Sequence, residues 1–290
     1  MGRAGDGADP GAPVAVPAAA GGPDMAVAAR AAAAAQVFVA DLDGLELSAP
    51  DSHHLGRVLR LRPGEPVVAA DGQGRWRLCS FRGSARSAGA GAGDRGRADP
   101  VLEAAGPVCT EPRPEPAVTV AFAPAKGERH EWVVQKLTEL GVDRMVPLAT
   151  DRSVVRWQGD RARHAVARLR RVAKEAAAQC RRVWLPEVAE VATVADLVAG
   201  EVRSGGPPAL AQLGGMSPWP ALRTVAVGPE GGWSPAELAM GLPRVGLADN
   251  VLRSETAAVA AGVLLGWLRA GLRDPTVRPG TVVPGTVTGT

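Results

Sequence analysis

The chain has 290 residues, 46% of them hydrophobic, and a formal net charge of +3, so it is long enough for two modest domains with real cores. No apolar run reaches the length of a membrane span, and the scattered cysteines Cys79, Cys109 and Cys180 match no disulfide framework or Cys/His ligand spacing. We therefore expect no membrane partner, no metal site and a cytoplasmic location.

Residues 1–35 consist mainly of Ala, Gly and Pro with few large apolar side chains. Such a segment cannot bury enough surface to offset the entropy of ordering, so we expect a disordered extension. Asp6, Asp9 and Asp24 interrupt the segment and it has no Leu-rich core, so it is not expected to be a signal peptide.

Residues 36–110 are typical of a small β-rich domain. Short apolar runs predict strands at 37–39, 66–70 and 76–81, and Asp71-Gly72 is a hairpin signal between the last two. Gly, Ala, Arg and Ser dominate residues 84–98, which predicts a flexible hairpin insertion.

A short helix is predicted at 52–61 in this domain. Its apolar face would hold Leu55, Val58 and Leu59. Arg57 and Arg60 would face away from the core.

The charge between positions 53 and 86 is lopsided. Only Glu65 and Asp71 oppose the arginines there, which are Arg57, Arg60, Arg62, Arg75, Arg77, Arg82 and Arg86. Guanidinium groups pair with phosphates and stack on bases, which favours a nucleic-acid face; the alternative is a solvated Arg-rich surface. His53 and His54 have no nearby His or Cys partners, so we interpret them as packing or RNA-contact residues rather than metal ligands.

A Pro-rich linker at 111–116 predicts a domain boundary, after which residues 117–273 alternate strand and helix. Strands are expected at 118–122, 145–148 and 225–227, and helices at 128–140, 160–182 and 254–272. The alternation predicts an α/β fold, with a parallel sheet covered by helices on both faces. The exposed arginines of the helix at 160–182 are either solvated surface or a second RNA contact. Residues 205–220 read as a Pro/Gly-rich connection, and residues 274–290 as a disordered tail.

A glycine-rich loop, Gly228-Pro229-Glu230-Gly231-Gly232, follows the strand at 225–227. Ser234, Pro235 and Glu237 then form a capping box that opens a helix. Glycines let backbone N–H groups approach a ligand at the sheet edge where α/β proteins bind ligands; the alternative is a plain tight turn. The loop lacks the Gly-Lys-Ser/Thr of a P-loop and does not open the first βαβ unit, so neither a phosphate cradle nor a dinucleotide fingerprint is indicated.

Together with Leu247 and the run from Val251 to Ala257, this loop resembles the SPOUT class of RNA methyltransferases. Within that class the chain is similar to the RsmE family, which methylates N3 of a uridine in 16S ribosomal RNA. Further segments resemble signatures of the same family in the same order: 126–128 with 136–142, 179–182 with 186–188, and 53–55 with 57–60. The resemblance covers roughly residues 37–272, and several motifs in order are far more specific than any one of them.

The resemblance implies an α/β catalytic domain with a C-terminal trefoil knot, an exception to the rule against knots, and a small N-terminal PUA-like β-barrel domain. It implies a homodimer that uses S-adenosylmethionine, with 16S rRNA or the small ribosomal subunit as its partner. It assigns cofactor binding to Leu148, Gly228, Pro229, Glu230, Gly231, Gly232, Leu247, Asn250, Val251 and Leu252. It assigns RNA binding to His53, His54, Arg57, Arg60, Arg129 and Arg182.

Methylation of uracil N3 removes a proton and develops negative charge on the ring. Arg253 is the candidate that would stabilise this charge, because it lies beside the cofactor segment and stays protonated. Glu230 is the ionisable group of the glycine-rich loop and would orient substrate or cofactor. Glu255 is either a further functional carboxylate or a residue that complements the helix dipole. No residue is a clear general base.

The chain departs from the family pattern at Ala248-Asp249-Asn250, where Gly-Pro-Arg is usual. Two other functions stay open beside methylation of 16S rRNA. One alternative is a non-catalytic RNA-binding factor for ribosome assembly, and another is a related SPOUT methyltransferase that acts on tRNA.

Overall fold

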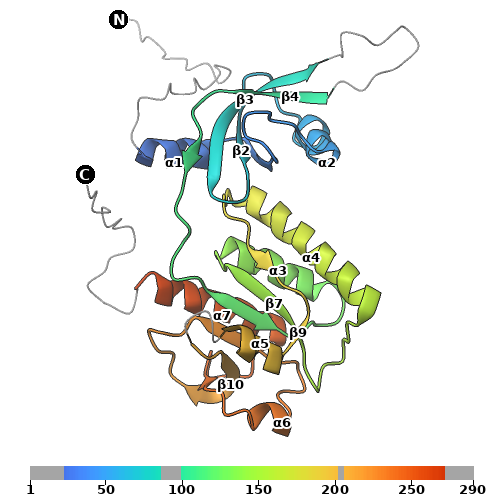
Figure 1. The fold of residues 1–290 in the computed structure, drawn as a ribbon, viewed down its shortest axis with the longest axis vertical. Coiled ribbons are helices and arrows are strands. Elements are labelled where there is room, and N and C mark those ends of the chain that lie inside the picture. Colours follow the sequence, from blue (N-terminus) through green and yellow to red (C-terminus); the bar gives the residue numbers. More distant parts are fainter. Residues whose placement is uncertain (1–22, 86–98, 202–205, 272–290) are drawn as a thin grey trace, which may run out of the picture. The chain divides into compact units, whose positions relative to one another are not determined.

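A computed structural model describes residues 23–85, 99–201 and 206–271 of the chain (Figure 1). The chain divides into two compact units between Arg113 and Pro114, and residues 178–184 belong to the first unit. The extension at 1–22, the insertion at 86–98 and the tail at 274–290 lie outside the described residues.

The first unit is built on a five-stranded sheet with the order β1-β2-β3-β4, in which β5 also pairs with β3. Its strands are β1 (Ala35–Phe38), β2 (Pro66–Ala70), β3 (Arg75–Ala85), β4 (Asp99–Ala104) and β5 (Cys109–Thr110). β1 runs parallel to β2, and the other pairs are antiparallel. The predicted hairpin is confirmed, because Ala70 pairs with Trp76 across the turn and Gly72 takes a positive φ of 78°.

The core of this unit gathers inward-facing residues of β1, β2 and β3 around the fully buried Leu55. Cys79 lies in this core, and burial raises the pKa of its thiol to about 11. The thiol is therefore neutral near neutral pH and packs as a small apolar group.

The prediction of disorder up to residue 35 is wrong for its last part. Helix α1 (Pro23–Ala32) precedes β1. The Arg30 guanidinium lies 5.6 Å from the centre of the Trp76 ring, forms an ion pair with Glu111 at 3.2 Å, and donates to the Arg181 carbonyl. Low hydrophobicity suggested disorder, but Ala favours helix and Arg30 fastens that helix to the unit.

The helix predicted at 52–61 is present in a modified form. Ser48 caps α2 (Ala49–His53), which continues as one π-helical stretch, η1 (His54–Val58). Leu55 is buried as predicted, but Val58 is 59% exposed and Leu59 is 40% exposed. The wider π-helical turn rotates these residues away from the face that a 3.6-residue period assigns to them.

The second unit contains a seven-stranded sheet among its described residues, with the order β12-β10-β11-β6-β7-β8 and with β9 paired to β7. The strands are β6 (Thr119–Phe122), β7 (Arg144–Ala149), β8 (Glu187–Val188), β9 (Ala192–Thr193), β10 (Ala209–Met216), β11 (Thr224–Val227) and β12 (Arg244–Val245). Every pairing in this sheet is parallel, which confirms the predicted α/β fold.

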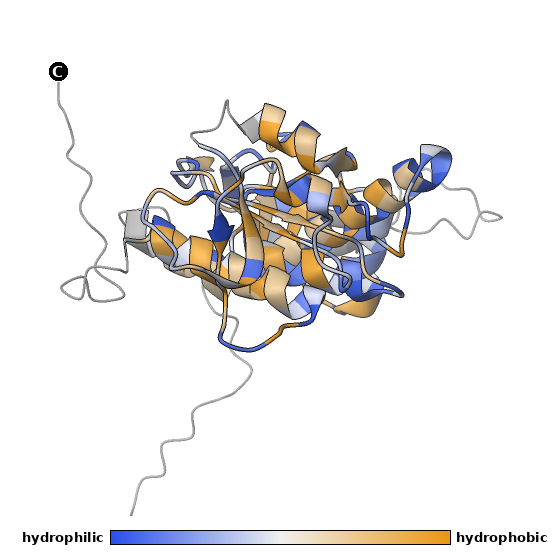
Figure 2. Cartoon of the chain, turned by 90° about the horizontal axis from the view of Figure 1, so that it is seen from below, coloured by the Kyte–Doolittle hydropathy of each residue, from blue (hydrophilic) through white to orange (hydrophobic). Residues whose placement is uncertain are grey.

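Helices cover both faces of this sheet. They are α3 (Arg129–Glu139), α4 (Gly159–Gln179), α5 (Val194–Glu201), α6 (Pro235–Leu238) and α7 (Ser254–Arg269). α3, α4 and α7 pack on the face that carries Val225 and Val227, while α5 and the region of α6 pack on the face that carries Ala226. Alternate residues of a strand point to opposite faces, so the short strands are buried on both sides, and Figure 2 shows hydrophobic residues along them.

Two sequence predictions for this unit need correction. The connection expected at 205–220 contains strand β10, whose Ala209 and Leu210 are buried between β11 and β12. The helix predicted to reach residue 182 ends at Gln179, and Arg181 takes a positive φ of 61°. The chain then leaves the helix direction, and the Arg182 carbonyl accepts a hydrogen bond from Gln36 at 2.8 Å in the first unit.

Candidate functional site

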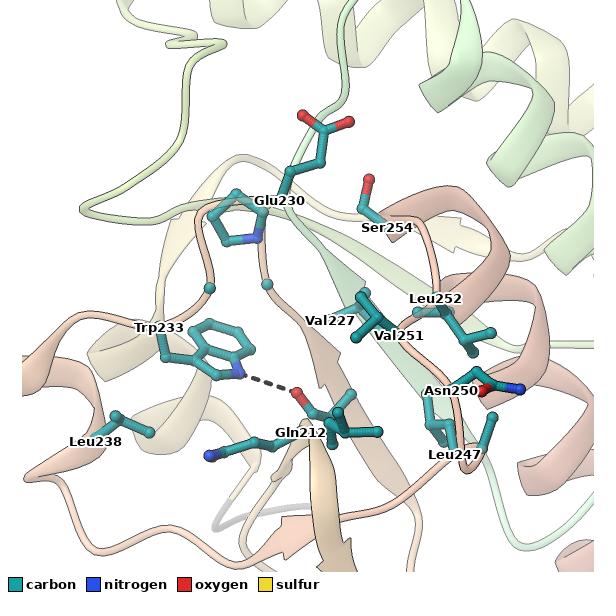
Figure 3. A pocket seen from close by; sticks show the side chains of 17 residues that line it. Gln212, Val227, Glu230, Trp233, Leu238, Leu247, Asn250, Val251, Leu252 and Ser254 are labelled. Atoms are coloured by element: carbon teal, nitrogen blue, oxygen red, sulfur yellow. Dashed lines mark hydrogen bonds between the residues drawn. The ribbon is translucent and has the colours of Figure 1, made fainter.

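A pocket of about 290 Å³ lies beside the carboxyl end of β11 in the second unit (Figure 3). Its walls come from the bulged part of β10, from the glycine-rich loop after β11, and from the segment that leads into α7. The lining residues are Ala211, Gln212, Leu213, Val227, Gly228, Pro229, Glu230, Gly232, Trp233, Leu238, Leu247, Ala248, Asn250, Val251, Leu252, Ser254 and Ala257. The pocket therefore joins the two sequence stretches that the motif analysis paired.

The glycine-rich loop is shaped by close contacts that exclude larger residues. A Cβ at Gly228 would lie 3.0 Å from the Trp233 ring, and Gly232 takes a positive φ of 67°. Trp233 Nε1 donates to the Ala211 carbonyl at 3.1 Å, which fixes the ring as one wall of the pocket (Figure 3).

The predicted capping box anchors the far end of the loop. Glu237 N donates to Ser234 Oγ at 3.2 Å, and the Glu237 carboxylate accepts from Ser234 N at 2.7 Å. Ser234 and Glu237 are buried, so the C-terminal end of the loop is held in place by packing and by these hydrogen bonds.

β10 contributes a wall that the sequence did not reveal. Ala211 and Met216 both pair with Val245, so the residues between them bulge out of the strand. The bulge brings Gln212 and Leu213 to the pocket. The Gln212 Oε1 atom is buried without a hydrogen-bond partner in the part of the chain that the structure describes. An unpaired buried amide oxygen is costly, which makes Gln212 a candidate acceptor for a bound ligand.

A charged group lies at the rim of the pocket. Arg129 Nη1 is 3.7 Å from Glu230 Oε1 and 3.5 Å from Glu255 Oε1. Glu255 stands in the first turn of α7, as its helix-dipole interpretation requires, but its side chain is only 14% exposed and is also paired. The arginine thus links the start of α3 to the glycine-rich loop and to α7.

The structure separates the predicted cofactor residues into two groups. Lining the pocket are Gly228, Pro229, Glu230, Gly232, Leu247, Asn250, Val251 and Leu252. Leu148 does not line it, since this side chain is 1% exposed within the core beneath Trp233. Gly231 faces away, and its carbonyl accepts from Arg152 Nη1 at 3.1 Å. Arg253 is the exposed N-cap residue of α7, next to the lining residues Leu252 and Ser254.

Some lining residues were missed by the sequence analysis. Trp233 directly follows the glycine-rich loop, so its position was a usable signal. Gln212 and Leu213 gave no signal, because their place depends on the bulge in β10.

The residues predicted to bind RNA are distributed over both units. His53, His54, Arg57 and Arg60 are exposed on α2, η1 and the residues that follow. Two arginines of the expected basic face instead form hydrogen bonds or ion pairs with other groups of the same chain. Arg77 donates to the Gly106 carbonyl at 2.9 Å and pairs with Asp43, and Arg82 pairs with Glu103.

Neither a metal-ligand cluster nor a membrane-spanning helix is found among the described residues. No cluster of three or more His, Cys, Asp or Glu residues could hold a metal ion there. None of the described helices combines the length and the apolar character that a membrane span requires.

Known proteins place these features in a family. Residues 112–266 match the RNA methyltransferase domain, and residues 47–83 match the RNA methyltransferase PUA domain. The ribosomal RNA small subunit methyltransferase E of Mycobacterium bovis is 35% identical over 244 residues, which cover 77% of this chain and 84% of that protein. The chain belongs to the ribosomal RNA small subunit methyltransferase E family. The resemblance identified from the sequence is confirmed.

Another member of the methyltransferase E family and a solved structure are also similar to this chain. The Synechocystis protein of that name is 31% identical over 236 residues, which cover 74% of this chain and 70% of that protein. A methyltransferase of Legionella pneumophila, solved with bound S-adenosylmethionine, superposes with a TM-score of 0.65 at 26% identity. That match covers 78% of this chain and 91% of the Legionella chain.

Proposed function

We propose that this protein methylates N3 of a specific uridine in 16S rRNA and takes the methyl group from S-adenosylmethionine. The observation that carries the proposal is the convergence of the glycine-rich loop, the β10 bulge and the segment 247–254 on one pocket. The family membership supplies the reaction, and the pocket supplies a place for the methyl donor.

The residues present fit S-adenosylmethionine. Trp233, Leu247 and Leu252 offer apolar surface for a flat base, and Gly228 and Gly232 leave backbone groups accessible. The unpaired Gln212 oxygen is available to an amino group of the ligand. When bound, the cofactor supplies an electrophilic methyl group on a sulfonium.

The chain's own residues must then orient the uracil and accommodate its charge. Arg253 is exposed next to Leu252 and Ser254 of the pocket wall and would donate to the uracil as negative charge develops there. Glu230 lies on the pocket rim, where the ion pair with Arg129 restrains its side chain. Because a restrained carboxylate keeps one orientation, Glu230 would orient the substrate. We assign the role of general base, which would remove the proton from N3, to no side chain of the pocket.

Finer features are part of the same proposal. A trefoil knot would bring the pocket segments together. A homodimer would cover Trp267 of α7, which is 61% exposed beside Gly266. Residues 36–110 would act as a PUA-like, barrel-shaped RNA-binding domain, residues 117–273 as the catalytic domain, and the enzyme would work in the cytoplasm.

The test is methyl transfer from labelled S-adenosylmethionine to small ribosomal subunits purified from a strain that lacks the enzyme, followed by mass mapping of the RNA. We expect one methyl group on N3 of one 16S uridine. Binding of the subunit without any transfer would replace the proposal by the assembly-factor function. Transfer to tRNA instead of rRNA would show that the chain is a related SPOUT methyltransferase that acts on tRNA.

A further inference from the structure

The loop between β7 and α4 contacts the glycine-rich loop and the capping box that follows it. Asp151 N donates to Glu237 Oε1 at 3.1 Å, and the Asp151 carboxylate accepts from Ser234 Oγ. Thr150 and Ser153, on either side, are buried and share a hydrogen bond of 2.7 Å between their hydroxyls. The backbone on both sides of Arg152 is therefore fixed.

Arg152, in the same loop, contacts one of the glycines directly. Its Nη1 donates to the Gly231 carbonyl at 3.1 Å, and its Cβ lies 3.4 Å from the position that a Cβ on Gly231 would occupy. Glu230 and Gly232, on either side of Gly231, both line the pocket. Arg152 thus contacts the loop at a residue that lies between two residues of the pocket lining.

The charge of Arg152 has no counterion among the described residues. Its hydrogen bond goes to a neutral carbonyl, the residue is exposed, and no carboxylate pairs with it there. Arg129, by contrast, is balanced by Glu230 and Glu255. A guanidinium with one donor used has further N–H groups in a fixed plane, which suits a phosphate oxygen.

We propose that Arg152 binds a phosphate of the substrate RNA while it holds Gly231, and so couples RNA binding to cofactor binding. A bound phosphate restricts the guanidinium, the guanidinium restricts the Gly231 carbonyl, and the loop is then ordered for the cofactor. Such coupling is reciprocal, so a bound cofactor also raises the affinity for RNA. Arg152 is a positioning residue in this scheme, and the inference rests on the proposed function.

The test variant is Arg152→Gln, which loses the charge. Its amide nitrogen stands near the position of Arg152 Nε, so the shorter side chain also gives up the Nη1 hydrogen bond to the Gly231 carbonyl. The matched control is Arg244→Gln, since Arg244 is exposed at the start of β12, at the opposite edge of the same sheet. Arg152→Lys keeps the charge without the planar fork.

Two binding measurements test the proposal with small ribosomal subunits that lack the methyl group. The first is the salt dependence of subunit affinity. We expect the slope to fall by about 0.7 for Arg152→Gln, as for one lost phosphate contact, and to stay at the wild-type value for Arg152→Lys and Arg244→Gln. An unchanged slope for Arg152→Gln overturns the phosphate contact.

The second measurement is the affinity for S-adenosylhomocysteine, which has no methyl group to transfer, with and without the subunit. We expect the subunit to tighten binding about fivefold for the wild type and for Arg244→Gln, and this gain to vanish for Arg152→Gln. An equal gain for Arg152→Gln overturns the coupling. If the wild-type protein binds the subunit but not S-adenosylhomocysteine, the proposed function itself is overturned. If the wild type binds both and Arg152→Gln shows the same gain in affinity, only the coupling is overturned.

Discussion

Arg129 Nη1 lies 3.5 Å from Glu255 Oε1, which ties the first residue of α3 to the first turn of α7 at the rim of the pocket. The same nitrogen is 3.7 Å from Glu230 Oε1 on the glycine-rich loop. One arginine predicted to bind RNA therefore restrains a carboxylate predicted to act in catalysis.

Arg129→Gln should lower turnover by about tenfold, because Glu230 loses the group that orients it. Its effect on the free energy of unfolding should be about 1–2 kcal/mol, because the pair with Glu230 is exposed and screened while Glu255, at 14% exposure, loses its cation. Turnover on small ribosomal subunits and thermal melting measure the two effects. Lys136→Gln is the control on the same helix, where the lysine pairs with Glu139. Equal losses in both variants would point to a general effect on α3.

Arg253→Ala should lower turnover by about 100-fold, which is the scale for loss of one donor that stabilises developing charge. The affinity for S-adenosylmethionine should change little, because Arg253 does not line the pocket. Single-turnover kinetics and calorimetry separate the two quantities. A parallel fall in turnover and affinity would place Arg253 in cofactor binding instead.

Gly228→Ala should weaken binding of S-adenosylmethionine by about tenfold, because the new methyl group lies 3.0 Å from the Trp233 ring and must displace a pocket wall. Gly200→Ala is the control, because Gly200 lies on α5 and a Cβ there meets no atom of the described residues within 4 Å. Calorimetric titration of both variants measures the difference, and similar affinities would show that Trp233 does not define the site.

The glycine-rich loop and its capping box were predictable because their signals are local. Glycines, a proline and the Ser234–Glu237 spacing act within a few residues, and the structure has the box as predicted. The Gln212 wall was not predictable, because its bulge exists only through the pairing of Ala211 and Met216 with the distant Val245. The same reason hid α1: its alanines favour helix, but the contact of Arg30 with the distant Trp76 holds that helix on the unit.

Arg57→Gln combined with Arg60→Gln should weaken binding to small ribosomal subunits and lower the salt slope by about 1.4, or about 0.7 for each lost phosphate contact. Both arginines are exposed in the first unit. Arg82→Gln is the control, because Glu103 already neutralises that arginine. Filter binding over a range of salt concentrations gives the slopes. A slope that does not change in the double variant would make the basic face an ordinary solvated surface.

The C-terminal end of α7 offers a test of stability that is separate from catalysis. Arg269 Nη1 donates to Asp143 Oδ2 at 2.7 Å, and Asp143 is 2% exposed. The same carboxylate oxygen accepts from Val118 N at 3.0 Å, so this one carboxylate joins α7 to the residue that precedes strand β6. Arg269→Met removes the cation and leaves the carboxylate buried, which should cost about 3 kcal/mol of the free energy of unfolding.

Urea denaturation followed by fluorescence measures this loss. Arg171→Met is the control, because Arg171 and Glu175 on α4 are 4.0 Å apart with exposed side chains, and their separation should change stability by less than about 1 kcal/mol. Burial, rather than the number of ion pairs, decides the outcome, since water can solvate Glu175 but not Asp143 when the arginine is gone. Equal shifts of the urea midpoint in the two variants would contradict that argument.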